Sequence, residues 1–261
     1  MRGVIKALLL ESIHPFGKET LERVGVEVTT HTGALDEDEL IDALQGVHLL
    51  GIRSKTNVTQ RVLDSAPHLK AIGAYCIGTN QIDLGAAARA GIATFNAPFS
   101  NTRSVVELAL AEIIALTRRL TEKDKALHDG RWDKSAEGAH EVRGRVLGIV
   151  GYGNIGTQLS VVAEALGMRV IFYDTAEKLA LGNAERMGTL DELLERADIV
   201  TLHVDGRPGN AGMFGAAQFA KMKEGAIFLN LSRGFLVDYA YLRTEIATGR
   251  LAGAAVDVFP E

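Results

Sequence analysis

Short runs of aliphatic and β-branched residues alternate along the chain with longer segments in which polar residues are frequent. The apolar runs of a first series lie at 4–10, 26–30, 47–52, 70–75 and 92–96, and those of a second series lie at 146–150, 169–173, 198–202, 226–230 and 253–257. A connection between parallel strands must hold a helix, and spacers of about ten to fifteen residues are long enough for one. The pattern therefore predicts two sets of parallel α/β units.

Glycine residues mark many of the junctions at which an expected helix ends and an apolar run begins. The glycines at these junctions are Gly25, Gly46, Gly91, Gly167 and Gly249. Glycine adopts the left-handed backbone conformation that closes the last turn of a helix without a steric penalty. These positions therefore support the expected boundaries between helices and strands.

Residues 104–120 lie between the two series and are predicted to form a helix. Ser104 and Glu107 have the spacing of a capping box, which would satisfy backbone donors at the helix start. Because the segment has almost no polar face before Arg118, we expect it to be buried, either between domains or in a subunit interface. A polar stretch at 121–145 then leads into the next apolar run.

The length of 261 residues favours two domains, because a typical domain has about 150 residues. We place the boundary so that residues 1–102 form one domain and residues 103–261 the other. The chain has 47% hydrophobic and 23% charged residues, which is ordinary for a globular protein. A formal net charge of -5 argues against nucleic acid and anionic membranes as partners.

The chain has a single cysteine, Cys76, which excludes an intramolecular disulfide. The first apolar run is too short for a secretory signal, and Glu11 follows it without a small-residue cleavage site. No stretch approaches the roughly 18 uninterrupted apolar residues of a membrane span. We therefore expect a cytoplasmic protein.

The second series begins with a glycine motif. Residues 146–156 read VLGIVGYGNIG, an apolar strand that runs directly into the pattern GxGxxG, and a helix is expected at 157–166. Gly151 would permit the tight turn, Gly153 would let a pyrophosphate approach the backbone, and Gly156 would let the helix pack closely on the sheet. The helix N-terminus presents free N–H groups to phosphates. The motif predicts a dinucleotide site, which Asn154 and Ile155 would border.

An acidic residue, Asp174, ends the next apolar run, eighteen positions after Gly156. A carboxylate at this place accepts hydrogen bonds from the ribose hydroxyls and repels a 2′-phosphate. The sequence therefore favours NAD over NADP as cofactor. We single out no metal-ligating residues.

Seven segments along the whole chain carry a resemblance to a known family. They are RSKTNVT at 53–59, AYCIGTNQIDL at 74–84, FNAPFSNTRSVVELALAE at 95–112, RGRVLGIVGYGNIGTQL at 143–159, LHV at 202–204, LNLSRG at 229–234 and GAAVDVFPE at 253–261. With these segments the sequence resembles the D-2-hydroxyacid dehydrogenases, above all those that act on 3-phospho-D-glycerate. The resemblance implies an α/β fold of two parallel-sheet domains, a flavodoxin-like substrate domain and a Rossmann NAD-binding domain.

The resemblance also implies an activity, the NAD-dependent oxidation of 3-phospho-D-glycerate to 3-phosphohydroxypyruvate at the first step of L-serine biosynthesis. Arg233 matches the catalytic arginine of the family, and its planar fork can hold a carboxylate or carbonyl oxygen. The residues implied for the substrate are Arg53, Ser54, Lys55, Ile77, Gly78, Asn101 and Lys134. Those implied for the cofactor, beyond the glycine motif and Asp174, are His203, Val204, Asn230, Ser232 and Asp257.

The family pattern breaks at the proton acceptor. In the family a histidine well after the DVFP motif removes the hydroxyl proton, and a glutamate five positions after the aspartate of the motif orients it. All seven histidines here precede Arg233, and Glu261 stands one place before the expected glutamate. We do not expect His203 to replace the base. We therefore expect a chain cut short, without the last strand, the return helix and a regulatory domain, and with little turnover.

The resemblance fixes neither the substrate nor the activity. The substrate could be another small hydroxy acid such as 2-hydroxyglutarate, or the chain could be a non-enzymatic NAD-binding module like the related corepressors. A cut chain could also expose a sheet edge and associate through it. By resemblance we expect a homodimer or homotetramer formed through the nucleotide domain. The glycine-rich loop at 205–215 departs from the family and is expected to be mobile.

Overall fold

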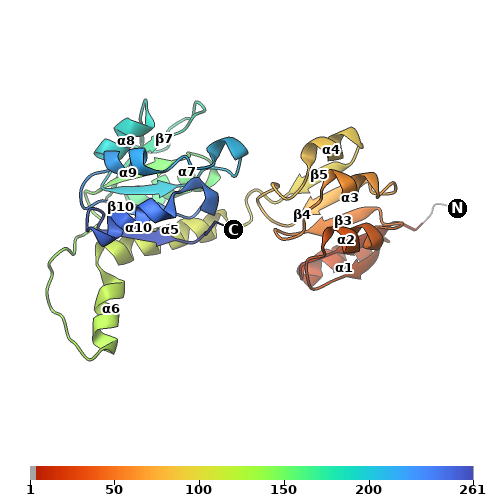
Figure 1. Cartoon of the computed structure of the whole chain (residues 1–261), viewed down its shortest axis with the longest axis horizontal. Helices are drawn as coiled ribbons and strands as arrows, with labels where there is room; N and C mark the ends of the chain where they lie inside the picture. The colour runs from red at the N-terminus through yellow and green to blue at the C-terminus, as the bar shows by residue number, and fades with distance from the viewer. Residues whose placement is uncertain (1–3, 261) are drawn as a thin grey trace. The chain divides into compact units, whose positions relative to one another are not determined.

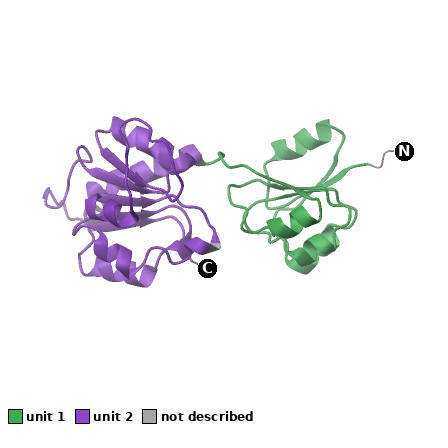
Figure 2. Ribbon diagram, turned by 90° about the horizontal axis from the view of Figure 1, so that it is seen from above, with its two compact units in different colours: residues 1–101 green, residues 102–261 purple. Residues whose placement is uncertain are grey.

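The computed structural model describes residues 4–260 and divides the chain into two compact units, residues 1–101 and residues 102–261. We expected the boundary one residue later. Figure 2 shows that each unit has its own sheet with helices on both faces. In both sheets every pair of neighbouring strands is parallel, and each strand is therefore joined to the next by a crossover.

Unit 1, residues 1–101, has five strands in the order β2-β1-β3-β4-β5. They are β1 (Lys6–Leu9), β2 (Glu27–Thr30), β3 (Leu49–Ile52), β4 (Ala71–Ala74) and β5 (Ala93–Asn96). The helices are α1 (Pro15–Arg23), α2 (Glu37–Ala43), α3 (Gln60–Asp64) and α4 (Leu84–Arg89). This strand order is that of flavodoxin, so the expected flavodoxin-like fold is confirmed. Leu40, Val62 and Ile72 are buried in its core.

Unit 2, residues 102–261, has six strands in the order β11-β10-β9-β6-β7-β8. They are β6 (Val146–Val150), β7 (Arg169–Tyr173), β8 (Glu185–Arg186), β9 (Ile199–Leu202), β10 (Ile227–Asn230) and β11 (Gly253–Val256). This is the order of the dinucleotide-binding fold, with β6 as its first strand. The Rossmann prediction is thus confirmed, while the strand and return helix expected beyond residue 261 stay a prediction.

The helices of unit 2 lie on both faces of this sheet (Figure 1). They are α5 (Thr102–Thr117), α6 (Leu120–His128), α7 (Asn154–Ala165), α8 (Leu190–Arg196), α9 (Ala216–Lys221) and α10 (Tyr239–Ala247), with short 3₁₀ turns η1 (Pro208–Asn210) and η2 (Gly234–Leu236). In the part of the chain that the structure describes, no helix is long and apolar enough to cross a membrane.

All ten strands that the apolar pattern predicts are present in the structure. The glycines at the junctions have left-handed backbone angles, with φ of +85° at Gly25, +73° at Gly46, +70° at Gly91, +80° at Gly167 and +76° at Gly249. The strand that the pattern missed is β8, which has two residues, Glu185 and Arg186, both exposed. A strand of two charged residues has no apolar signal.

The long helix between the two series differs from its prediction at both ends. The helix α5 begins at Thr102, so Ser104 lies inside the first turn and the predicted capping box is wrong. The carboxylate of Glu107 instead pairs with Arg103 Nε at 2.7 Å, one helical turn away. At its other end α5 stops at Thr117, because Arg119 adopts a left-handed φ of +54°.

Only one face of α5 is covered by the rest of unit 2. Val106, Ala109 and Ile113 are fully buried in the same core cluster as Leu147 and Ile149 of β6, whereas Leu108 is 37% and Ile114 39% exposed. Within this chain the predicted burial of the helix is therefore found on one face, and the other face is exposed.

The polar stretch after α5 contains a further helix that the sequence did not indicate. The helix α6 projects from the body of unit 2 as an arm (Figure 1). Lys123 Nζ pairs with Asp133 Oδ2 at 2.6 Å, and Lys134 Nζ lies 4.0 Å from the centroid of the Trp132 ring. The first contact ties the returning segment to α6, and the second lies within that segment.

Candidate functional site

The turn between β6 and α7 is built on glycine. Gly151 has a φ of +94°, and a Cβ atom placed on it would lie 2.6 Å from the backbone oxygen of His203. A Cβ atom on Gly156 would collide with the backbone oxygen of Gly151. A side chain at Gly151 would thus push the turn away from the end of β9. A side chain at Gly156 would push α7 away from the turn.

The backbone of Gly153, at the N-terminus of α7, has open space beside it. The helix begins at Asn154, three residues before the predicted start, and its N-cap residue Gly153 provides no side-chain hydrogen bond. A Cβ atom on Gly153 would meet nothing within 4 Å. Backbone N–H groups in the first turn of a helix attract phosphate oxygens, and Ile155 and Asn154 lie in this turn. The backbone N–H groups of this turn can therefore bind the oxygens of a pyrophosphate.

The carboxylate of Asp174 is fixed at the end of β7. Its Oδ2 accepts a hydrogen bond from the backbone N–H of Tyr152 at 2.8 Å, and its Oδ1 accepts one from Ala176 N–H at 2.8 Å. The Tyr152 ring is buried and stacks on Phe172 with 3.7 Å between the ring centroids. Each carboxylate oxygen keeps a further lone pair, which fits two ribose hydroxyls.

The end of β9 carries a buried imidazole. His203 Nε2 lies 3.0 Å from Thr201 Oγ1, and its Nδ1 is buried without a hydrogen-bond partner. Burial lowers the pKa of His203 to about 4. A group with this pKa is poorly matched to proton transfer near neutral pH. Val204, the next residue, is half-buried.

The loop after β10 is held by Asn230, which is fully buried. Its Nδ2 donates to the Arg233 carbonyl oxygen at 2.9 Å, and its Oδ1 accepts from Ser232 N–H at 3.1 Å. Ser232 Oγ donates to the carbonyl oxygen of Leu202 at the end of β9. Arg233 Nη1 donates to the Ser232 carbonyl oxygen at 2.7 Å, so the loop also orients the guanidinium.

The segment after β11 lies against the same loop. Asp257 is exposed, and its N–H donates to the Asn230 carbonyl oxygen at 3.1 Å. Tyr239 Oη donates to the Val258 carbonyl oxygen at 2.6 Å. A Cβ atom on Gly234 would collide with the backbone of Phe259, so glycine is required beside Arg233.

The predicted residues of unit 2 thus gather at one edge of its sheet. Gly151, Asp174, His203, Arg233 and Asp257 follow β6, β7, β9, β10 and β11. Open parallel sheets bind ligands at the carboxyl ends of their strands, on the side where the strand order reverses. The reversal lies between β6 and β9, next to Gly151 and His203.

In unit 1 the structure brings most of the candidate substrate residues together. Arg53, Ser54 and Lys55 follow β3 and are exposed, while Ile77 and Gly78 follow the adjacent strand β4 and are half-buried. The loops that carry these residues are therefore neighbours.

Two other candidate substrate residues lie elsewhere. Asn101 is the exposed last residue of unit 1, and Lys134 is an exposed residue of the segment that follows α6 in unit 2. The structure does not place Lys134 at the edge of the unit 2 sheet that carries Arg233.

Sequence reasoning missed two buried polar residues beside the substrate loops of unit 1, Glu11 and Gln81. Glu11 directly follows the first apolar run, at the carboxyl end of a parallel strand, and this position was a usable signal. Gln81 lies in the segment at 74–84 that carries the family resemblance, but the pattern assigned it no role.

Residues 110–261 match the family model for the D-isomer specific 2-hydroxyacid dehydrogenase, NAD binding domain. The chain belongs to the D-isomer specific 2-hydroxyacid dehydrogenase family. Unit 2 is therefore the NAD-binding domain of a 2-hydroxyacid dehydrogenase, in agreement with the glycine turn and Asp174. Among residues 4–260 no group of three or more histidine, cysteine or acidic side chains could hold a metal ion.

Similar proteins of the family include a D-3-phosphoglycerate dehydrogenase from Haemophilus influenzae, 49% identical over 260 residues and 99% of this chain. D-3-phosphoglycerate dehydrogenase 2 from Saccharomyces cerevisiae is 49% identical over 258 residues and 99% of this chain. This chain spans 63% of the length of the bacterial relative and 55% of that of the yeast relative.

This chain is also similar to a solved structure, D-lactate dehydrogenase from Aquifex aeolicus complexed with NAD and lactic acid. The two share 26% sequence identity with a TM-score of 0.86, over 98% of this chain and 77% of the other. The fold assigned from strand order is thus the fold of the family.

Proposed function

We propose that this chain carries the nucleotide and substrate units of an enzyme that oxidises 3-phospho-D-glycerate to 3-phosphohydroxypyruvate, the first step of L-serine biosynthesis. The observation that carries the proposal is the 49% identity over 260 residues to a D-3-phosphoglycerate dehydrogenase. That similarity includes unit 1, where the candidate phosphate ligands lie, whereas the family model matches only residues 110–261.

When bound, NAD would supply the hydride acceptor, and the residues of the chain would bind the cofactor and the substrate and orient them. In the proposed site the first turn of α7 binds the pyrophosphate, and Asp174 binds the adenosine ribose through its hydroxyls. Arg233 holds the carboxylate or the reacting oxygen of the substrate through its planar fork. Backbone N–H groups of Ile77 and Gly78 bind the substrate carboxylate.

The cationic side chains Arg53 and Lys55 bind the substrate phosphate in this proposal. Their exposure supports the assignment, because a phosphate dianion in solution must reach the ligands that bind it. Ser54 supplies a hydroxyl donor between them. Asn101 and Lys134 are additional ligands by resemblance only.

None of these residues is assigned as the base that removes the hydroxyl proton of the substrate. None of the seven histidines stands where the family base is expected, and the pKa of His203 is about 4. A general base contributes about 10² to 10⁴ in rate. We therefore expect residues 1–261 alone to bind NADH and substrate but to turn over slowly.

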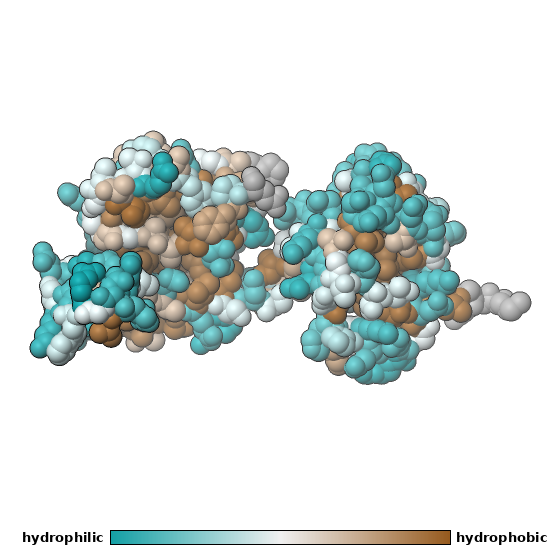
Figure 3. All heavy atoms as spheres, turned by 60° about the horizontal axis from the view of Figure 1, so that its bottom comes forward, coloured by the Kyte–Doolittle hydropathy of each residue, from teal (hydrophilic) through white to brown (hydrophobic). Residues whose placement is uncertain are grey.

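We also propose that the chain forms a homodimer or homotetramer through unit 2. Leu108 and Ile114 on α5, and Leu120, Leu127 and Trp132 on the arm, are large exposed apolar side chains that support such a contact. On the face shown in Figure 3, apolar surface gathers on the body of unit 2. The low cysteine content supports a cytoplasmic location.

Ligand titrations test the proposed function directly. NADH binding to the 261-residue chain is followed by fluorescence, and the NADH-saturated protein is then titrated calorimetrically with 3-phospho-D-glycerate and with D-2-hydroxyglutarate. We expect the phosphorylated acid to bind more tightly. Tighter binding of 2-hydroxyglutarate would favour the alternative substrate, and NADH binding without either acid would favour a corepressor-like module.

A further inference from the structure

The carboxylate of Glu11 is buried in unit 1, where the residue is 7% exposed. Its Oε1 accepts hydrogen bonds from the backbone N–H groups of Arg53 and Thr56, each at 3.0 Å. Its Oε2 accepts a third from Lys55 N–H at 3.0 Å. One side chain thus fixes the backbone of a loop 42 or more positions away in the sequence.

Gln81, also 7% exposed, holds this loop through its carbonyl groups. Its Nε2 donates to the Arg53 carbonyl oxygen at 2.7 Å and to the Gly78 carbonyl oxygen at 3.2 Å. The carboxylate therefore binds the N–H groups of the loop, and the amide links the loop to the one that follows β4.

The backbone at Glu11 is strained. Glu11 and Ser12 have φ of +58° and +52°, a left-handed conformation that residues with a side chain rarely adopt. The pair is held by hydrogen bonds from Glu11 N–H to Gly33 and from Ser12 N–H to His31. Such strain persists where the surroundings impose it, and it gathers at functional sites.

The charge of Glu11 is retained despite its burial. Burial by itself raises the pKa of a carboxyl group, but hydrogen bonds from Thr56, Lys55 and Arg53 outweigh it and hold the pKa of Glu11 below its usual 4.5. Charge-assisted hydrogen bonds to an ionised acceptor are about twice as strong as neutral ones. The loop is thus anchored by a stronger set of bonds than a neutral side chain would give.

We propose that Glu11, assisted by Gln81, is a positioning residue for the phosphate of the substrate. It fixes the backbone of residues 53–56, so that the exposed side chains of Arg53 and Lys55 are directed to one phosphate before it binds. The inference rests on the proposed function, since it needs these two cations to be phosphate ligands. Neither Glu11 nor Gln81 touches the substrate in this arrangement. Their effect is preorganisation of the loop that does.

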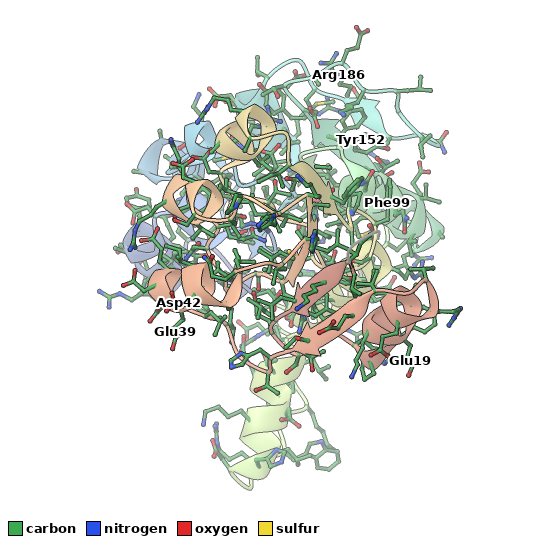
Figure 4. All side chains as sticks on the ribbon, turned by 90° about the vertical axis from the view of Figure 1, so that its right-hand side faces the viewer. Glu19, Glu39, Asp42, Phe99, Tyr152 and Arg186 are labelled. Carbon is green, nitrogen blue, oxygen red and sulfur yellow. The ribbon has the colours of Figure 1, made fainter. Side chains whose placement is uncertain are left out.

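The test replaces Glu11 by its isosteric amide. Glu11→Gln keeps the size of the side chain but removes the charge and one acceptor oxygen. The matched control is Glu19→Gln, an exposed glutamate on α1 that points into solvent (Figure 4). The 261-residue chain and both variants are saturated with NADH and titrated with 3-phospho-D-glycerate and with D-glycerate. Amide hydrogen exchange at residues 53, 55 and 56 is measured by NMR.

For Glu11→Gln we expect faster exchange at the three amides and about tenfold weaker binding of 3-phospho-D-glycerate, or about 1.4 kcal/mol. D-glycerate and NADH should bind as they do to the parent chain, because their contacts lie outside residues 53–56. The ratio of the two acid affinities is a readout that general destabilisation of unit 1 would not change selectively. Glu19→Gln should leave every quantity unchanged.

An unchanged ratio in a folded Glu11→Gln variant, with or without faster amide exchange, would overturn the positioning role alone. Failure of the parent chain to prefer 3-phospho-D-glycerate over D-glycerate would instead remove the proposed function and this inference together. If Glu11→Gln does not fold, Glu11→Asp decides, because the shorter side chain keeps the charge but cannot reach all three N–H groups of the loop. The same selective loss of phosphate affinity is then expected.

Discussion

The carboxylate of Asp174 accepts a hydrogen bond from the backbone N–H of Tyr152, with 2.8 Å between the two atoms. The acid at the end of β7 is thereby joined to the glycine turn after β6, so the proposed ribose and pyrophosphate ligands form one rigid unit. Ala176 N–H binds the other carboxylate oxygen and sets the rotation of the group.

Replacement of this acid should weaken NAD binding and relax cofactor choice. Asp174→Ala removes two hydrogen bonds to ribose and the repulsion of a 2′-phosphate, so we expect NADH to bind at least tenfold more weakly. NADPH affinity should fall less or rise. Fluorescence titration with both nucleotides measures this, and Asp191→Ala, which loses only an ion pair with Lys221, is the control. Equal losses for both nucleotides would count against the assigned role.

Alanine substitutions at Gly151 and Gly153 should have different effects, one on stability and the other on NADH binding. Gly151→Ala forces a Cβ atom against His203 at a φ of +94°, so we expect a loss of about 1–3 kcal/mol in the free energy of unfolding. Gly153 has a φ of -88° and its Cβ atom would face open space. Gly153→Ala should therefore keep the stability but weaken NADH binding. Urea denaturation and NADH titration of both variants test the separation.

Acid should destabilise unit 2 through His203. The pKa of His203 is about 4 in the folded protein, below its usual 6.5, so the unfolded chain binds the proton more readily. The stability present at neutral pH is therefore lost as the pH falls from 6.5 towards 4. Linkage gives a loss of about 2 kcal/mol between pH 7 and pH 5. His203→Gln should flatten this slope in urea denaturation curves, and an unchanged slope would contradict the assignment.

Replacement of the Arg233 guanidinium should weaken substrate binding and leave the stability of the protein unchanged. Arg233→Lys keeps the charge but loses the planar fork, so we expect about tenfold weaker binding of 3-phospho-D-glycerate to the NADH-saturated chain. The free energy of unfolding and the NADH affinity should stay within experimental error. Arg243→Lys, an exposed position on α10, is the control in the same titration.

Association of the chain should depend on the exposed face of α5. Leu108→Glu and Ile114→Glu place charges on this face without entering the core, which Val106 and Ala109 fill from the other side. We expect analytical ultracentrifugation to show an oligomer for the parent chain and a monomer for the double variant. An oligomer that persists in the double variant would place the interface elsewhere.

The apolar pattern predicted the two sheets because the strands inside each sheet, such as β3, β6, β9 and β10, are largely buried and sharply bounded. The five glycines that close helices have the left-handed φ angles expected of them, so the helix ends predicted from glycine agree with those in the structure. The glycine motif and Asp174 could likewise be located, since their chemistry depends on adjacent residues in one βαβ unit.

What the sequence did not predict depends on contacts between distant residues. Glu11 stands at the end of an apolar run, but its partners come from residues 42 to 45 positions away, so the sequence does not show which groups it binds. The capping box of Ser104 failed because α5 extends to Thr102, which is buried. The arm helix α6 has few apolar positions facing a core, and Ala126 is its buried residue.

The contact between Gly151 and His203 has a consequence for how the protein matures. The turn closes against a backbone 52 positions later in the chain, after β7, β8, α8 and β9 have been added. Contacts of such separation form slowly, because the intervening chain must be ordered first. The peptide 146–166 alone would therefore not hold the turn, and nucleotide affinity during refolding would rise only when the centre of the sheet has assembled. NADH can thus report the assembly of the centre of this sheet rather than the first, local steps of folding.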